Sequence, residues 1–361
     1  MTVEETKVDL ADVLIDLHPQ AFARLYSLAD SPEATTAMRN THLYMILSRP
    51  RITVSLDENP LFTNPQIRIR SAKSGPFEEV DFRRPEDITS LGLGSTTGMR
   101  FQGPVDIIED GRRVRLRMSG SSMLDVDASH LAALAAVDLD QARLTEASKW
   151  EVQYVGMAFG GDGTRSAIQR LSDGHTTLSR ILSEQGHSRE VIVVPIQIAQ
   201  SSIHISPGFA NGGKPFDFAH FLDLNYALTP DGKRETDGIV KLVENTLISY
   251  FKPAYNKTLL KWPAVSQAVT FRDLGVRSIL IGYEGSGDLA YLFSDSQPTA
   301  RRSFVFDAEL RGQHRLVDLR DDEWDHDRPI SELAESLIRH GSGSSPSLRV
   351  FDSEVQDIVP L

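Results

Sequence analysis

Cysteine is absent from the 361-residue sequence. This absence excludes disulfide bonds, thiolate nucleophiles and cysteine-based zinc sites. No apolar run approaches the roughly 18 residues that indicate a membrane-spanning helix. The first residues, Met1 to Lys7, are acidic and lack the basic and apolar regions of a signal peptide. We therefore expect a cytoplasmic protein that does not span a membrane.

Two common catalytic motifs are also missing. The sequence has no Gly-x-Ser-x-Gly elbow, so we do not propose a serine hydrolase. The glycine-rich run from Gly92 to Gly98 lacks the Gly-Lys-Ser/Thr ending of a phosphate-binding P-loop, and we interpret it as a turn.

Basic residues are outnumbered, because 38 Lys and Arg stand against 50 Asp and Glu and give a formal net charge of −12. A protein that coats nucleic acid needs Lys and Arg for phosphate contacts, so this function is disfavoured. The stretch from Ile239 to Trp262 differs, since it contains four lysines and the single acidic residue Glu244. An enzyme with a locally basic site therefore remains compatible with the composition.

A chain of this length suggests two or three domains. We expect an α+β protein whose residues 1–125 form a separate N-terminal α+β domain that supplies targeting or partner contacts. Apolar spacing predicts helices over Val8–Ala29 and Thr35–Leu47. Arg112 to Arg117 alternates as the solvated face of a strand would, and Glu109-Asp110-Gly111 indicates a hairpin turn. The expected strands are Arg51–Leu56, Gln66–Ile69, Pro76–Phe82, Val105–Ile108 and Val114–Met118.

The central region, residues 126–265, carries the most informative pattern. Trp150 to Phe159 and Val191 to Ile198 are apolar runs that indicate strands. Helices are expected around Arg170 and from Ile239 to Phe251. Because Arg170 and Glu244 are far apart in sequence, we expect an insertion at about residues 199–238.

The C-terminal region, residues 266–361, is expected to be a β-rich extension. Ser278–Tyr283 and Leu289–Phe293 flank the run Glu284–Asp288, which indicates a hairpin. Ser303–Leu310 is a further strand candidate, and Pro329–His340 is expected to be an amphipathic helix.

An aromatic residue, an arginine, a glutamate and an asparagine follow one another in the central region, at Tyr154, Arg170, Glu244 and Asn256. Phosphodiester hydrolysis uses these residue types. The forked guanidinium of an arginine matches the geometry of a phosphate. A carboxylate can hold Mg²⁺, which keeps most of its waters and takes oxygen ligands. A tyrosine hydroxyl beside the metal can orient or deprotonate the nucleophile.

Each of these residues also has an ordinary structural interpretation. Tyr154 alternates within a strand and suits the core, and Arg170 suits an exposed helix position. Glu244 lies beside the buried side of its helix and suits a solvated flank. Asn256 is a normal residue after the end of a helix. Only the order of the set favours a functional site.

The ordered set resembles the GIY-YIG endonuclease superfamily over about a third of the chain, in separated pieces. Tyr154-Val155-Gly156 is similar to the second half of the family's name motif, and Arg170, followed by His175, is similar to the helix that carries its arginine. Glu244 and Pro253–Asn256 are similar to its metal-binding helix and closing asparagine.

The resemblance implies a GIY-YIG-like α/β nuclease module with a β-sheet flanked by helices. In this module Glu244 would hold Mg²⁺ or Mn²⁺, and Arg170 would contact phosphate. Tyr154 would orient or activate the nucleophile, and Asn256 would stabilise the site region. The resemblance assigns His175 a role in handling a phosphate or a proton.

One part of the family pattern is missing. The first tyrosine motif should stand roughly ten residues before Tyr154, but Gln141 to Ala147 contains no tyrosine. The first hypothesis is a metal-dependent endonuclease that acts on nucleic acid, with DNA as the expected substrate. The second is a module of the same fold that has lost catalysis and binds nucleic acid or a protein partner. Under the first hypothesis, Arg170 and Glu244 project from two helices toward Tyr154 on the adjacent strand.

Overall fold

The computed structural model describes residues 11–22, 32, 35, 41–57, 66–71, 75–80, 101–118, 123–128, 149–158, 165–186, 188–205, 237–262, 266–273, 276–284, 290–310, 314–317 and 348–349. The turn expected at Gly92–Gly98 and the helix expected over Pro329–His340 lie outside this part of the chain.

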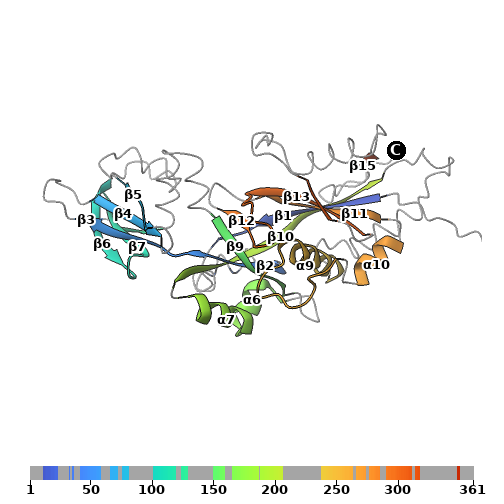
Figure 1. The fold of residues 1–361 in the computed structure, drawn as a ribbon, viewed down its shortest axis with the longest axis horizontal. Helices are drawn as coiled ribbons and strands as arrows, with labels where there is room; N and C mark the ends of the chain where they lie inside the picture. Colours follow the sequence, from blue (N-terminus) through green and yellow to red (C-terminus); the bar gives the residue numbers. More distant parts are fainter. Residues whose placement is uncertain are drawn as a thin grey trace, which may run out of the picture.

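A nine-stranded sheet forms the body of the protein, with the strand order β12-β9-β2-β10-β1-β11-β13-β14 and with β15 paired to β10 beside this path (Figure 1). Its strands are β1 (Ala11–Pro19), β2 (Leu43–Pro50), β9 (Lys149–Met157), β10 (Arg189–Ile205), β11 (Val276–Glu284), β12 (Tyr291–Phe293), β13 (Ser303–Glu309), β14 (His314–Val317) and β15 (Leu348–Arg349). The accompanying helices are α6 (Ala167–Ser172), α7 (Thr176–Gln185), α9 (Asp237–Phe251) and α10 (Ser266–Asp273). The protein is mixed α+β, as the sequence predicts.

Helices pack on both faces of this sheet, as the alternation of side chains along β2 shows. Leu43, Met45 and Leu47 belong to the larger core cluster, together with apolar residues of α9 and α10. Tyr44 and Ile46 belong to a smaller cluster with residues of α6 and α7. A strand that is buried on both faces reads as a continuous apolar run rather than as an alternating one.

The N-terminal strands belong to the central sheet. β1 pairs antiparallel with β10 and parallel with β11, while β2 lies between β9 and β10. The expected helices are therefore wrong over Ala11–Pro19 and Leu43–Leu47, because apolar residues on both faces of a buried strand mimic helical spacing. The expected domain boundary at residue 125 is also wrong, since β1 and β2 complete the sheet that contains β9.

A buried carboxylate ties β1 to β11. Asp12, which is 1% exposed, accepts hydrogen bonds from Nε of Arg277 at 2.9 Å and from Oγ of Ser278 at 2.8 Å. A second guanidinium nitrogen of Arg277 binds the other carboxylate oxygen. Because loss of one partner would leave a buried charge without compensation, these contacts favour a single register for the two parallel strands.

Two small three-stranded sheets stand between β2 and β9 in the sequence and lie at one end of the molecule (Figure 1). The first contains β3 (Ile52–Asp57), β4 (Gln66–Ser71) and β5 (Gly75–Val80), and the second contains β6 (Phe101–Ile108), β7 (Arg113–Met118) and β8 (Met123–Asp127). The Val54 amide donates to the Gly111 carbonyl at 2.7 Å and joins the two sheets. The strands and the β6–β7 hairpin predicted here are confirmed.

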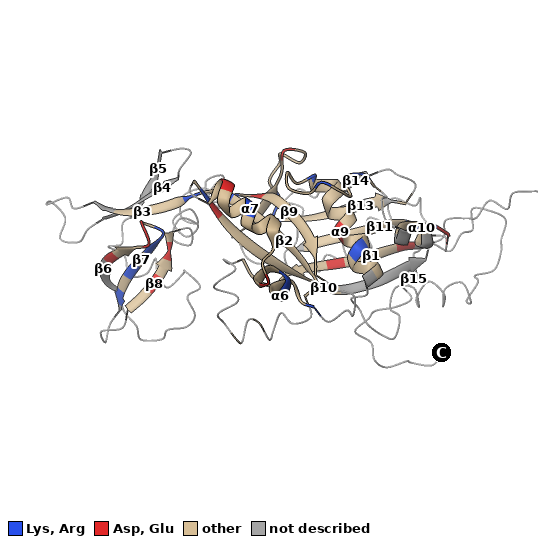
Figure 2. Cartoon of the chain, turned by 90° about the horizontal axis from the view of Figure 1, so that it is seen from below, with Lys and Arg blue, Asp and Glu red and all other residues tan. Residues whose placement is uncertain are grey.

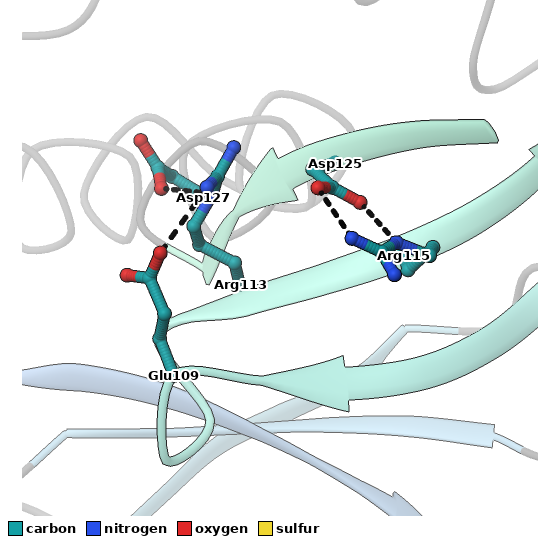
Figure 3. A network of polar contacts seen from close by, with 5 residues as sticks. All are labelled: Glu109, Arg113, Arg115, Asp125 and Asp127. Atoms are coloured by element: carbon teal, nitrogen blue, oxygen red, sulfur yellow. Dashed lines mark hydrogen bonds and ion pairs between the residues drawn. The ribbon is translucent and has the colours of Figure 1, made fainter. Parts of the chain in front are cut away.

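Two arginines of β7, Arg113 and Arg115, are paired with acidic side chains (Figure 3). Arg115 binds both oxygens of Asp125, at 2.7 and 3.0 Å, and Arg113 lies 3.2 Å from Glu109 and 3.4 Å from Asp127. Figure 2 shows basic and acidic positions side by side on β7 and β8. The alternating run is thus the polar face of a strand, as expected, and acidic side chains pair with two of its arginines.

The inserted sheets leave the pairing of β2 with β9 intact. Ser48 lies opposite Glu151, so Pro50 and Lys149 stand where a hairpin turn would join the two strands. At this exit the Arg51 amide donates to the Ser188 carbonyl at 3.1 Å, and its guanidinium binds the Gly186 carbonyl. The chain therefore leaves the main sheet at one fixed point.

The C-terminal strands extend the same sheet instead of forming a separate region. β11 pairs with β1 and β13, whereas β12 pairs with β9, so the hairpin expected around Glu284–Asp288 is wrong. The strands expected at Ser278–Tyr283 and Ser303–Leu310 are confirmed within two residues. β10 runs to Ile205, so residues 199–205 belong to the sheet and not to the expected insertion.

In the described part of the chain, no helix is both long enough and apolar enough to cross a membrane.

Replacing residues 52–148 with a four-residue turn that has Asn-Gly at its centre is expected to leave the main sheet folded, because β2 and β9 already lie in hairpin register. Circular dichroism should show one cooperative transition within about 5 °C of that of the full chain. Deletion of Leu43–Pro50, an interior strand, is the control and should abolish the transition. A non-cooperative unfolding transition in the variant that lacks residues 52–148 would show that the inserted sheets are part of the core.

Candidate functional site

Two tyrosines meet on the face of the sheet that α6 and α7 cover. In the antiparallel pair of β2 and β9, Tyr44 lies opposite Gly156 and Ile46 lies opposite Tyr154. Tyr44 and Tyr154 are thus diagonal neighbours on one face, within reach of each other's large side chains. Their ring centroids are 6.1 Å apart.

Gly156 makes room for this pair of rings. A Cβ atom at this position would lie 2.5 Å from Cε1 of Tyr154 and 2.7 Å from the hydroxyl of Tyr44. Both distances are shorter than contacts between non-bonded atoms. The glycine of the Tyr154-Val155-Gly156 motif is therefore required because the Tyr44 side chain crosses the strand at that point.

Arg170 reaches the tyrosines from α6. This short helix begins with a capping box, in which Ser166 and Gln169 bind each other's backbone amides at 3.3 and 2.9 Å. The Ala167 amide donates to the Thr41 carbonyl at 2.7 Å, which fastens the start of α6 to the residues before β2. Arg170 lies in the last turn, and its positive charge lowers the pKa of the Tyr44 hydroxyl against the effect of burial.

His175 enters the same cluster from the start of α7. Its ring lies 2.9 Å from the Tyr44 hydroxyl through Nε2 and 3.0 Å from the Leu178 amide through Nδ1. Its centroid is 5.8 Å from that of Tyr44 and 5.5 Å from that of Tyr154, both in edge-on arrangements. Three rings, from β2, β9 and the N-cap of α7, therefore form one aromatic group.

Glu244 approaches from α9 at the end of β9. Its Oε1 accepts a hydrogen bond from the Met157 amide at 3.0 Å. Burial raises the pKa of the Glu244 carboxyl from 4.5 to about 7, although the Met157 amide and the positive charges of Arg170 and Lys241 act in the opposite direction. The carboxyl therefore titrates near neutral pH and lies close enough to Arg170 to feel its charge.

Beyond the short strand β12, three residues bind backbone groups along the edge of β9. The Tyr255 amide donates to the Gln153 carbonyl at 3.1 Å. The Asn256 side chain binds Val155 twice, accepting from its amide at 2.9 Å and donating to its carbonyl at 2.8 Å. Glu244 binds the next available amide, that of Met157. Asn256 therefore holds the strand segment that carries Tyr154 and Gly156.

Unpaired polar atoms remain in the cluster. Nε of Arg170 is buried and has no hydrogen-bond partner among the described residues. An unpaired guanidinium donor beside two phenols suits an anionic oxygen, such as one of a phosphate. Burial and the Glu244 charge raise the pKa of Tyr154, and burial with the charge of Arg170 lowers that of His175.

The donor set fits a hard divalent cation held by one carboxylate. No group of three or more His, Asp or Glu residues that could hold a metal ion is present in the described ranges. Glu244 accepts its hydrogen bond through Oε1, which leaves Oε2 able to bind a cation together with water and substrate oxygens. Mg²⁺ is commonly bound in this way, through one or two carboxylates with several retained waters.

The structure brings together all five residues selected from the sequence. Four of them lie close together and are each only partly buried: Tyr154, Arg170, His175 and Glu244. The fifth, Asn256, binds the backbone of the strand that carries Tyr154. Tyr44 is the residue that sequence reasoning missed. It stands about 110 residues before Tyr154 rather than about ten, because the small sheets occupy the turn between the two strands.

No family model, no curated protein and no solved structure matches this chain.

Gly156→Ala is expected to disrupt the tyrosine pair, because the new methyl group would displace Tyr44 or Tyr154. Overpacking at this position should lower the free energy of unfolding by about 1–3 kcal/mol. Gly174→Ala is the matched control, since its Cβ would meet no atom within 4 Å and adds only the strain of a positive φ. Near-ultraviolet circular dichroism should change for Gly156→Ala alone.

Glu244→Gln is expected to stabilise the metal-free protein at alkaline pH. Because the folded pKa of about 7 exceeds the ordinary 4.5, protonation favours the folded state, and this stabilisation is lost as pH rises through 7. Glutamine does not titrate. The difference in free energy of unfolding between the variant and the native protein should shift by about 2–3 kcal/mol in favour of the variant between pH 4 and pH 8.

Urea denaturation at both pH values measures this effect, with the exposed Glu184→Gln as the control for charge removal. Mg²⁺ should recover the stability of the native protein and leave Glu244→Gln unchanged. Equal pH dependence in the two proteins would show that Glu244 does not titrate near neutrality.

Proposed function

We propose that this protein is a divalent-metal-dependent phosphodiesterase that cleaves nucleic acid, with DNA as the first substrate to test, through a site of the GIY-YIG type. The observation that supports this most directly is the convergence of Tyr44, Tyr154, Arg170 and Glu244 from four different elements. These residues are remote in sequence, and none of their contacts is explained by local helix or strand structure alone.

The arrangement around β9 also supports a module of this type. β9, β2 and β10 are neighbouring antiparallel strands of the sheet, with α6 and α7 on one face and α9 on the other. Tyr44 takes the place of the upstream tyrosine that the family pattern requires. In this proposal the two small sheets are an insertion within the module rather than a domain that precedes it.

Each side chain has a distinct part in the proposed reaction. A Mg²⁺ or Mn²⁺ ion, when bound at Glu244, supplies positive charge to the phosphate and to the leaving oxygen. Arg170 offers its unpaired Nε to a non-bridging oxygen and stabilises the charge that grows there in the transition state. Lys241 on α9 adds positive charge that acts on Glu244, and the exposed Lys252, Lys257 and Lys261 follow this helix in the sequence.

The hydroxyls of Tyr44 and Tyr154 hold and move the proton of the nucleophile. Tyr154 is the more accessible of the two, since Tyr44 is fully buried. The positive charge of Arg170 lowers the pKa of both phenols against the effect of burial. The phenolate form of Tyr154, which this charge favours, would accept the proton of a neighbouring water.

Cleavage of supercoiled and linear DNA is expected to require Mg²⁺ or Mn²⁺ and to stop with EDTA. Glu244→Gln should reduce the rate by about 10²–10³-fold while DNA binding is retained, because the substitution removes the charge that holds the metal. Arg170→Ala should weaken both cleavage and binding, since the guanidinium contacts the phosphate in the ground state as well.

Matched controls separate chemistry from folding. Glu184→Gln and Arg180→Ala make the same changes on α7, outside the cluster, and should cleave as the native protein does. Tyr154→Phe removes the hydroxyl and should slow cleavage with little loss of binding. Tyr283→Phe is its control, since the buried Tyr283 hydroxyl has no partner among the described residues. Full activity of Glu244→Gln would contradict the proposed mechanism. DNA binding without cleavage by the native protein would instead favour the catalytically inactive binding module.

A further inference from the structure

His175 uses both nitrogens of its ring, and the two bonds join different parts of the site. Nδ1 lies 3.0 Å from the Leu178 amide, which makes His175 the N-cap of the ten-residue helix α7. Nε2 lies 2.9 Å from the Tyr44 hydroxyl on β2. The start of α7 and the orientation of Tyr44 therefore depend on the same imidazole.

The helix cap determines which nitrogen carries the proton. A backbone amide can only donate, so Nδ1 must present its lone pair to the Leu178 amide. A neutral imidazole with an unprotonated Nδ1 has its proton on Nε2, and this N–H can only donate to the Tyr44 oxygen. Capping of α7 thus fixes the direction of a hydrogen bond inside the tyrosine cluster.

The Tyr44 oxygen therefore accepts a hydrogen bond from Nε2 of His175. A phenol oxygen that accepts from the imidazole must direct its own proton away from it. The Tyr154 ring is the neighbouring phenol, with its centroid 6.1 Å from that of Tyr44. The histidine thus biases the Tyr44 proton toward the second tyrosine.

We propose that His175 is a positioning residue that directs the Tyr44 hydroxyl proton toward Tyr154, and that capping of α7 holds it in the required tautomer. The proposal rests on the proposed function. It differs from the role implied by the family resemblance, in which the histidine handles a phosphate or a proton. An imidazolium would set an N–H against the Leu178 amide and would stand beside Arg165 and Arg170, so a charged His175 is disfavoured.

Nuclear magnetic resonance of the full chain tests the tautomer without reference to any activity. Nitrogen shifts of the His175 ring at pH 7.5 should show a protonated Nε2 and an unprotonated Nδ1, and Tyr44→Phe should keep this tautomer because the cap remains. An Nδ1-protonated or doubly protonated ring would overturn the proposal, whether or not the protein cleaves DNA.

Two substitutions separate the cap from the contact with Tyr44. Asparagine is a favourable N-cap but is too short to reach Tyr44, so His175→Asn should melt as the native protein does. His175→Ala loses the cap as well and should melt about 2–4 °C lower. Both variants should change the Cζ resonances of Tyr44 and Tyr154 and leave that of Tyr255 unchanged.

The kinetic expectation follows from loss of one hydrogen bond within the site. Both variants should lower kcat by about 10–100-fold with KM nearly unchanged. Unchanged kcat in His175→Asn, with an active native protein, would overturn the positioning role. If the native protein cleaves no nucleic acid, the proposed function fails by itself, and unchanged tyrosine resonances in His175→Asn would then refute the inferred contact separately.

Discussion

The antiparallel pairing of β2 with β9 is the interaction on which the candidate site depends. It places Tyr44 diagonally opposite Tyr154 and directly opposite Gly156, where only a glycine leaves room for the Tyr44 ring. A shift of the pairing by one residue would turn either tyrosine to the other face of the sheet, where α9 packs. The apolar residues that alternate with the tyrosines therefore protect the site, because such a shift would also move Leu43, Met45 and Leu47 out of the main core.

An insertion at the turn of this strand pair is tolerated because the pairing does not depend on what connects the strands. Loop-closure entropy grows only with the logarithm of loop length, so a connection of about a hundred residues costs little more than a short one. The polar contacts of Arg51 at the exit point, together with the pairing of Arg189 with Glu151, tie the strand ends to one another. The separation of Tyr44 from Tyr154 in sequence therefore has little structural consequence, although it hides their relation from sequence comparison.

The sequence was most informative where structure is local. The strand of Tyr154, the helix of Arg170 and the helix of Glu244 follow from patterns within a few residues, and all are confirmed. The apolar spacing of β1 and β2 predicts helices because a strand buried on both faces lacks period-two alternation. The same pattern hides Tyr44, which falls within an expected helix and lies outside the expected spacing. The contacts of Asn256 with Val155 could not be derived either, because an asparagine after a helix has many local uses and only the folded chain shows the strand edge that it covers.

The edge of β9 shows how stability and the proposed chemistry are linked. A strand edge leaves amides and carbonyls unpaired, and here Tyr255, Asn256 and Glu244 satisfy successive ones instead of another strand. Using Glu244 for this purpose is costly, since burial disfavours its charge and raises its pKa to about 7. A glutamine would accept the same Met157 bond without that cost. The same carboxylate is, however, the group that a divalent cation would require, and cation binding would favour the charged form that folding disfavours. Under the proposed function, the energetic penalty at Glu244 and the unpaired Nε of Arg170 would have a common explanation, because a metal ion and a phosphate would complete the charges of the site.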